Sequence, residues 1–165
     1  MKTHIYLSFL LLLGLQARGD DGTIQKWGVI TNGIQMSIAL DGRDRDINTN
    51  EQFQLLVQIK NLGASNAWSY VENVANSESG SGLHCDVVSP SGKDISPNIE
   101  FRGEGGGFIN LLSGTTNSFK FDLSSICKFN EIGLYKITAQ KAISQGEKSW
   151  TVTSNPLFVK VIRAK

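Results

Sequence analysis

The chain has 165 residues and a formal net charge of +1, with 16 basic and 15 acidic side chains. That length supports one domain with a core of its own. A nearly neutral chain with mixed signs has no long-range field that would attract nucleic acid or an anionic membrane, so the charge argues against partners of both kinds.

Residues 1–19 are predicted to be an export signal. The apolar run at 5–15 has the length of a signal-peptide core and is too short to cross a bilayer. Small residues at the −3 and −1 positions predict cleavage before Asp20, with cleavage after Ala17 or an uncleaved anchor as alternatives. We therefore expect residues 20–165 to form a single exported domain, periplasmic or extracellular, with no membrane span after signal cleavage.

Beyond this segment the apolar residues recur with a period of two, as in antiparallel strands that bury one face. In chain order the alternating runs cover residues 34–40, 53–59, 119–123, 135–139 and 157–161, with turn-forming residues at 41–50, 61–66, 89–92, 103–107 and 144–146. The only helical candidate in this part of the sequence is a turn or two at 124–129. The pattern predicts an all-β, antiparallel sandwich of about seven strands.

The residues around position 135 predict a corner of the immunoglobulin-like type. Tyr135 follows Gly133 near the start of the sixth strand, where such sandwiches carry a Tyr that hydrogen-bonds back to the preceding corner. Ile137 stands where an antibody domain has its second Cys, and the 53–59 strand has no Cys. Gly133 and Tyr135 are therefore predicted structural corner residues of an immunoglobulin-like β-sandwich that is not a true immunoglobulin domain.

Three motifs give the chain a family resemblance. They are Asp122-Leu-Ser124, the Gly-x-Tyr motif at Tyr135, and Ser154-Asn-Pro-Leu157. With them the chain resembles secreted bacterial immunoglobulin-like domains of unknown function, and the sandwich domains that precede some secreted metallopeptidases, over roughly residues 33–162. The motifs are architectural, so the resemblance implies a fold and leaves the activity open.

Cys85 and Cys127 are a candidate disulfide, because two cysteines in an oxidising compartment allow one bridge. The bridge would close a loop of about 40 residues and stabilise the domain by about 3–4 kcal/mol in the chain-entropy model. The alternative is two separately buried thiols, since a free Cys packs as a small hydrophobic residue.

Catalytic and metal-binding patterns are weak, so we expect no enzyme, no cofactor and no metal site. After cleavage His84 would be the only His, and its neighbour Cys85 would point to the opposite face of a strand, out of hydrogen-bonding reach. One His and two distant Cys do not supply a zinc or copper site. Residues 44–55 begin like a calcium loop, but Thr49 and Leu55 occupy the positions that require Gly and Glu.

Aromatic residues are the remaining indication of a binding surface. Trp68 and Tyr70 would share one face of a strand, and Trp27 and Trp150 would either cover sandwich edges or lie exposed. An inward-facing Trp68–Tyr70 pair would be core, which is the favoured interpretation. An outward-facing pair would form an exposed aromatic patch, the usual mark of a binding face.

The sequence thus predicts a non-catalytic module that acts by surface contact with an unknown protein or polysaccharide, through unknown residues. The alternative is a secreted protease inhibitor of the loop-insertion type, because the glycine-rich 103–107 loop resembles the Gly-x-Gly-Gly loop of chagasin-like inhibitors. The other two inhibitor loops are not matched, since residues 61–66 and 144–147 stand in the comparable places with different sequences.

Overall fold

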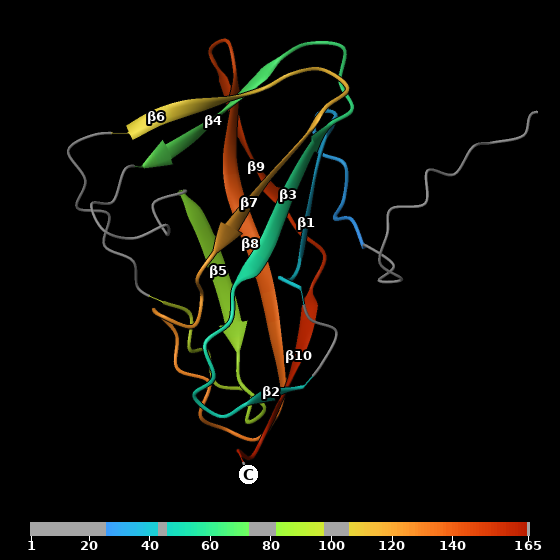
Figure 1. Cartoon of the computed structure of the whole chain (residues 1–165). Helices are drawn as coiled ribbons and strands as arrows, with labels where there is room; N and C mark the ends of the chain where they lie inside the picture. Colours follow the sequence, from blue (N-terminus) through green and yellow to red (C-terminus); the bar gives the residue numbers. More distant parts are fainter. Residues whose placement is uncertain (1–25, 43–45, 73–81, 98–105, 165) are drawn as a thin grey trace, which may run out of the picture.

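The computed structural model describes residues 26–42, 46–72, 82–97 and 106–164. The predicted export signal lies outside the described residues, as do positions 103–105 of the glycine-rich loop. The described part is all-β and contains no helix. Its strands form two sheets, and Figure 1 shows β8 running through the length of the molecule, with β10 and the C-terminus at one end.

The smaller sheet has three antiparallel strands in the order β1-β3-β7. They are β1 (Ile34–Leu40), β3 (Leu55–Asn61) and β7 (Thr116–Phe121). The register places Met36 opposite Ile59, and Val57 opposite Phe119. Because side chains alternate between faces, these apolar residues share one face of the sheet. Their branched and aromatic side chains suit a half-buried pleated surface, which explains why these segments are extended.

The larger sheet is built around β8 (Gly133–Gln145). Its other strands are β2 (Ile47–Asn48), β4 (Ala67–Glu72), β5 (Leu83–Val88), β6 (Gly106–Leu111), β9 (Lys148–Thr153) and β10 (Leu157–Ile162). One edge of β8 pairs with β5 and then β4, and the other edge pairs with β10 and then β9. β6 lies beyond β4, and β2 lies beyond β10 in the one parallel pairing between described strands.

β9 and β10 would be one continuous strand without an interruption at Ser154. The Ser154 N–H donates to the Ala139 carbonyl (2.9 Å), and the Ser154 hydroxyl accepts from the Ala139 N–H (3.0 Å). The side chain therefore replaces a backbone acceptor that the ladder lacks at this point. Ser154 also forms a parallel bridge to Met36 of β1, so the interruption joins the two sheets. The Ser-Asn-Pro motif thus has a structural role.

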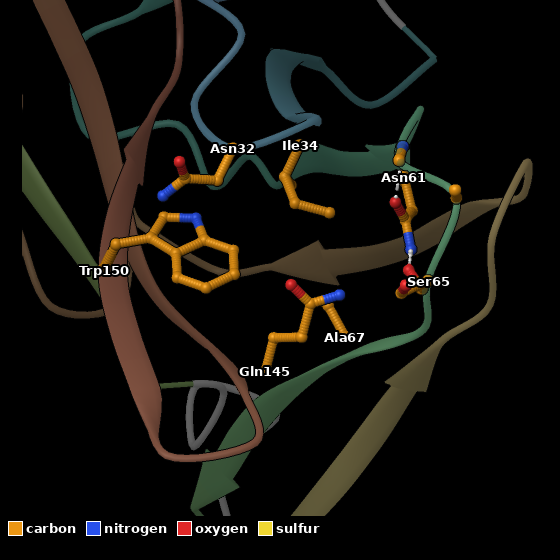
Figure 2. Close-up of a pocket in the computed structure, with 9 residues that line it drawn as sticks. Asn32, Ile34, Asn61, Ser65, Ala67, Gln145 and Trp150 are labelled. Atoms are coloured by element: carbon orange, nitrogen blue, oxygen red, sulfur yellow. Dashed lines mark hydrogen bonds between the residues drawn. The ribbon is translucent and has the colours of Figure 1, made fainter.

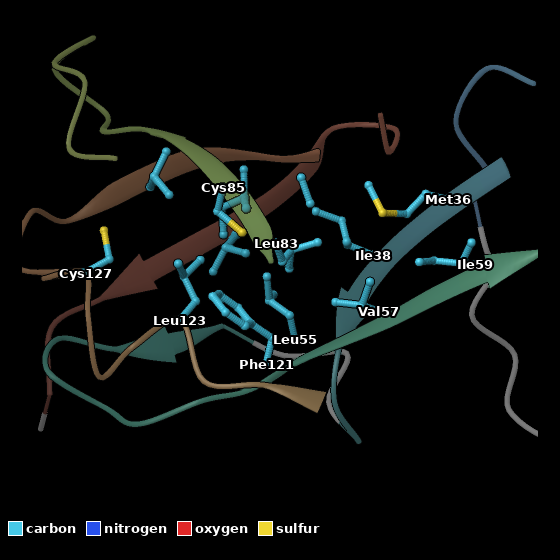
Figure 3. Packing of buried hydrophobic residues seen from close by; sticks show 14 of the residues in the cluster. Met36, Ile38, Leu55, Val57, Ile59, Leu83, Cys85, Phe121, Leu123 and Cys127 are labelled. Carbon is cyan, nitrogen blue, oxygen red and sulfur yellow. The ribbon is translucent and has the colours of Figure 1, made fainter. Parts of the chain in front are cut away.

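One cluster of buried apolar side chains lies between the two sheets (Figure 3). The smaller sheet contributes Met36, Ile38, Leu55, Val57, Ile59 and Phe121, and the larger sheet contributes Leu83, Cys85, Tyr135, Ile137 and Val159, among others. At one end of the core the Phe129 ring contacts the rings of Phe53 and Tyr135, with centroid distances of 4.9 and 5.0 Å. Burial of these groups is the main force that holds the sheets together.

The corner before β8 is held by Tyr135. Its ring is fully buried, and its hydroxyl accepts a hydrogen bond from the Glu131 N–H (2.9 Å). Gly133 has a φ of 137°, and a Cβ at this position would lie 2.8 Å from the Pro90 side chain. The corner therefore requires glycine at position 133, both for its backbone conformation and for the space that Pro90 fills.

We predict that Tyr135→Phe lowers the free energy of unfolding by about 1–2 kcal/mol, because the Glu131 N–H loses its acceptor while the ring stays packed. Urea unfolding followed by fluorescence measures this change. A variant within about 0.5 kcal/mol of the wild type would mean that the hydrogen bond contributes nothing net.

The structure differs from the sequence-based prediction in three places. The described residues contain ten strand segments rather than about seven, because β9 and β10 are separate, β2 is a short strand of two residues, and β6 lies where a connector was predicted. Gly106 and Gly107 belong to β6, so the predicted connector at 103–107 ends in a strand. The helical candidate at 124–129 is a single turn, in which the Cys127 N–H donates to the Leu123 carbonyl (3.0 Å).

Candidate functional site

The outer face of β4 and β6 carries exposed aromatic residues. Trp68 on β4 is 43% exposed and Phe108 on β6 is 66% exposed. Asn110 lies opposite Trp68 in the ladder and Phe108 lies opposite Tyr70, so all four positions share one face. Ala67 and Ser69 are the inward residues of β4, and both are buried. The favoured interpretation of Trp68 as core is therefore wrong, because the neighbouring small residues take the inner positions.

This aromatic face continues onto β8 and β9, whose outward side chains on this half of the sheet are neutral. Trp68 lies beside Ser144, and Ser144 lies beside Ser149, so one row runs across β6, β4, β8 and β9. The remaining outward positions on this half of β8 and β9 are Gln140, Ala142, Thr151 and Thr153. Most of these side chains carry a hydroxyl or an amide, and the Gln140 amide donates to the Asp86 carboxylate of β5 (2.9 Å), so a charge borders this end of the row. We call Trp68, Phe108, Asn110, Ser144, Ser149 and Thr151 the upper face.

The opposite half of the same sheet has a different character. Phe158 and Leu134 are more than half exposed, and Val88 is about one third exposed. Lys136 lies between Val88 and Phe158 in the register, and Lys160, which pairs with Asp46 at 2.9 Å, lies opposite Leu134. This lower patch therefore combines aliphatic and aromatic surface with charges, which the upper face lacks.

Trp27 and Trp150 are both partly buried. The Lys60 ammonium lies 5.9 Å from the centre of the Trp27 ring, which places this Trp over the smaller sheet. Trp150 is on the inner face of β9, and its Nε1 is shielded from solvent without a hydrogen-bond partner among the described residues. An unpaired buried N–H of this kind costs about 1–3 kcal/mol.

Trp150 lines a hollow of about 170 Å³ at the end of the molecule near the β8–β9 turn. In Figure 2 its ring faces Asn61 and Ser65 across this space, with Gln145 and Ala67 below. The Asn61 side chain is buried, and its amide donates to the Ser65 and Leu111 carbonyls (2.9 and 2.8 Å) and accepts from the Gly63 N–H (2.9 Å). Through these hydrogen bonds the Asn61 side chain holds the 61–66 loop in place, so we assign Asn61 a structural role.

Two of the three loops in the comparison with protease inhibitors lie side by side. The Gln145 amide donates to the Asn66 carbonyl (3.2 Å), which joins the 61–66 loop to the 144–147 turn. The third, the glycine-rich segment at 103–107, differs from a free loop, because Gly106 and Gly107 pair with Glu72 and Val71 in a strand ladder. The pairing makes this part of the predicted loop a piece of the sheet.

His84 and Cys85 lie on opposite faces of β5. The His84 ring is exposed and its Nε2 lies 3.1 Å from the Asp86 carboxylate, whereas Cys85 is fully buried. Among the described residues no group of three or more His, Cys, Asp or Glu gathers at one place. Within the same part of the chain there is no helix with the length and hydropathy that a membrane crossing requires.

Cys85 and Cys127 are buried and unbonded in this structure (Figure 3). The Cys127 thiol donates to the Ile95 carbonyl (3.2 Å). Burial, followed by the Asp86 charge and Cys127, raises the pKa of Cys85 to about 12. Burial also raises the pKa of Cys127 to about 11. A bridge between them stays a prediction, which a mass measurement of the protein under non-reducing conditions decides: an oxidised chain is lighter by two hydrogen atoms.

For the reduced protein the raised pKa of Cys85 predicts alkaline destabilisation. The folded state holds the thiol proton more tightly than the unfolded state, whose thiol pKa is near 9.0. The stability that the protonated Cys85 thiol adds to the folded state is therefore complete below pH 9. It is lost as the pH rises toward 12, at no more than about 1.4 kcal/mol per pH unit. Urea unfolding at pH 8, 9.5 and 10.5 measures the decline. Cys85→Ala should make this decline shallower and leave the part that comes from Cys127, whose pKa is also raised, and an unchanged slope would contradict the assignment.

A second hollow, of about 270 Å³, is lined by Asp41, Phe53 and Asp122, among others. The Asp41 carboxylate is 2.7 Å from the Lys120 ammonium. The Asp122 carboxylate accepts bonds from the Ser124 hydroxyl and the Ser125 N–H. Both acids therefore have structural partners.

No protein-family model matches the chain, and no curated protein is similar to it. The fold is similar to solved structures. The putative ApaA protein from Bordetella pertussis has a TM-score of 0.51 at 10% identity, over 86% of this chain and 100% of that one. The C-terminal domain of wzt has a TM-score of 0.51 at 13% identity, over 84% and 78%. A structural genomics target, SoR45, has a TM-score of 0.47 at 11% identity, over 81% and 90%. At these identities the likeness concerns the fold alone.

Proposed function

We propose that this protein is an exported, non-catalytic module of immunoglobulin-like sandwich fold that binds its partner through the upper face. The fold proposal draws on the β1-β3-β7 sheet, the order β10-β8-β5 in the other sheet, and the Tyr135 corner. Export draws on the predicted signal at residues 1–19.

The observation that carries the binding proposal is the outward exposure of Trp68 and Phe108 on neighbouring strands. Large aromatic rings cost free energy when they contact water, and a folded protein normally buries them. Here the inner positions of β4 are filled by Ala67 and Ser69, so the alternation of the strand places Trp68 outward. Exposed aromatic clusters of this kind mark contact surfaces.

The experiment is a sedimentation assay with the surface fraction of the producing cell. The Trp68→Ala/Phe108→Ala double variant should be retained at least about tenfold less than the wild type, the size of a single aromatic contribution at a binding surface. Phe158→Ala is the matched control, because Phe158 is also aromatic, is 56% exposed and lies on the same side of the same sheet. Equal retention of all three proteins would refute binding through the upper face.

A further inference from the structure

We propose that the partner of the upper face is an uncharged polysaccharide. This inference rests on the proposed function and names the chemical class of the ligand.

The first argument is the polar chemistry around the aromatic residues. The side chains beside Trp68 in its row are Asn110 and Ser144, followed by Ser149, whose hydroxyl is 3.4 Å from that of Ser144. Thr151 lies one outward position further along β9. Hydroxyl and amide groups both donate and accept hydrogen bonds, as sugar hydroxyls do. A carboxylate or sulfate on the ligand would instead need cationic partners, which this row does not supply.

The second argument is the placement of the rings. Phe108 is the diagonal neighbour of Trp68 across the β4–β6 ladder, which puts the two positions roughly 7–8 Å apart on one face. Two flat rings on neighbouring strands of a sheet can contact successive apolar faces of sugar rings, while the hydroxyls at the sugar edges reach the neighbouring Ser and Asn side chains.

A comparison with the lower patch indicates whether a polysaccharide or a protein is the better partner for the upper face. The fully buried centre of a protein interface is apolar, with charges confined to its rim. The lower patch supplies large apolar side chains of the kind found in such a centre, Phe158 and Leu134, although Lys136 and Lys160 lie among them. On the upper face the rings are bordered by hydroxyl and amide groups instead of aliphatic side chains. The upper face therefore matches a polyhydroxylated ligand better than it matches a protein surface.

The test treats the surface fraction of the producing cell in two ways before the sedimentation assay. Periodate cleaves vicinal diols and should reduce the Trp68-dependent retention at least tenfold, whereas digestion with a broad protease should leave it unchanged. Loss of retention after protease, with full retention after periodate, would overturn the polysaccharide assignment and leave the proposed function standing. Retention that does not depend on Trp68 and Phe108 would refute both the polysaccharide assignment and the proposed binding through the upper face.

Charge selectivity is tested by competition. Polysaccharide released from the same surface fraction is divided by anion exchange into an unbound, uncharged pool and a bound, acidic pool. The uncharged pool should displace the wild-type protein and should quench or shift its tryptophan emission, and Trp68→Ala should remove most of that change. Displacement by the acidic pool alone would overturn the inference. Unfolding curves of Trp68→Ala and Phe158→Ala that match the wild type confirm that the variants are folded.

Discussion

Replacing Asn61 by Ala should lower the free energy of unfolding by about 3 kcal/mol, because three hydrogen bonds of a buried amide are lost together. The bond to the Leu111 carbonyl joins β3 to the end of β6, and the bonds to Ser65 and Gly63 close the loop that follows β3. Thermal unfolding should fall by roughly 10 °C in a domain of this size.

The matched control is Asn117→Ala, which removes the same side chain from the neighbouring strand. The Asn117 amide makes one exposed bond, to the Asn110 carbonyl at 3.2 Å, so its loss should cost less than about 1 kcal/mol. Equal costs for the two substitutions would show that the Asn61 amide is no more important than a surface one. Because Asn61 also lines the end hollow, the unfolding measurement keeps its structural role separate from any effect on binding.

The second large effect is expected at Gly28. A Cβ at this position would lie 2.1 Å from the Thr153 carbonyl oxygen and 3.1 Å from that of Met36, and both are backbone atoms. Gly28→Ala should therefore separate this segment from β1 and β9, breaking the bond from the Gly28 N–H to the Met36 carbonyl (2.8 Å). We expect a loss of about 3 kcal/mol, at the upper end for a substitution that overfills a packed site.

Hydrogen exchange distinguishes local separation from general destabilisation, because the Gly28 region should exchange faster before the core does. Gly42→Ala is the control. Gly42 has a φ of 63° with no atom within 4 Å of an added Cβ, so it carries only the backbone penalty of about 1–2 kcal/mol. If Gly28→Ala lowers the free energy of unfolding no more than Gly42→Ala does, the close approach to Thr153 does not exclude a side chain at position 28.

The strands with regular alternation could be predicted from the sequence. Residues 34–40 were expected to be extended and form β1 with those bounds. β6 was missed because its Gly106-Gly107 start has a loop composition and leaves only four residues of strand-like sequence. Glycine weakens the strand signal, and here the antiparallel ladder with β4 outweighs that local preference.

The candidate site could be predicted only in part. Alternation shows that Trp68 and Tyr70 share a face, but it does not say which face is inward. That choice depends on the tertiary packing, which buries Ala67 and Ser69 and leaves Trp68 exposed. Phe108 joins the site through pairing of β4 with β6, about 40 residues away in sequence, and a period-two pattern holds no information on such pairing.

The parallel contacts between the two ends of the chain bear on how the module responds to tension. β1 meets the β9–β10 segment in parallel at Met36 and Ser154, and β10 pairs in parallel with β2. When two parallel strands are pulled by their opposite ends, their hydrogen bonds are loaded along the strand direction at the same time. They must then break together rather than one after another. Force transmitted from the segment before β1 to the C-terminal end of β10 would therefore load the Met36–Ser154 bridge between the sheets in shear.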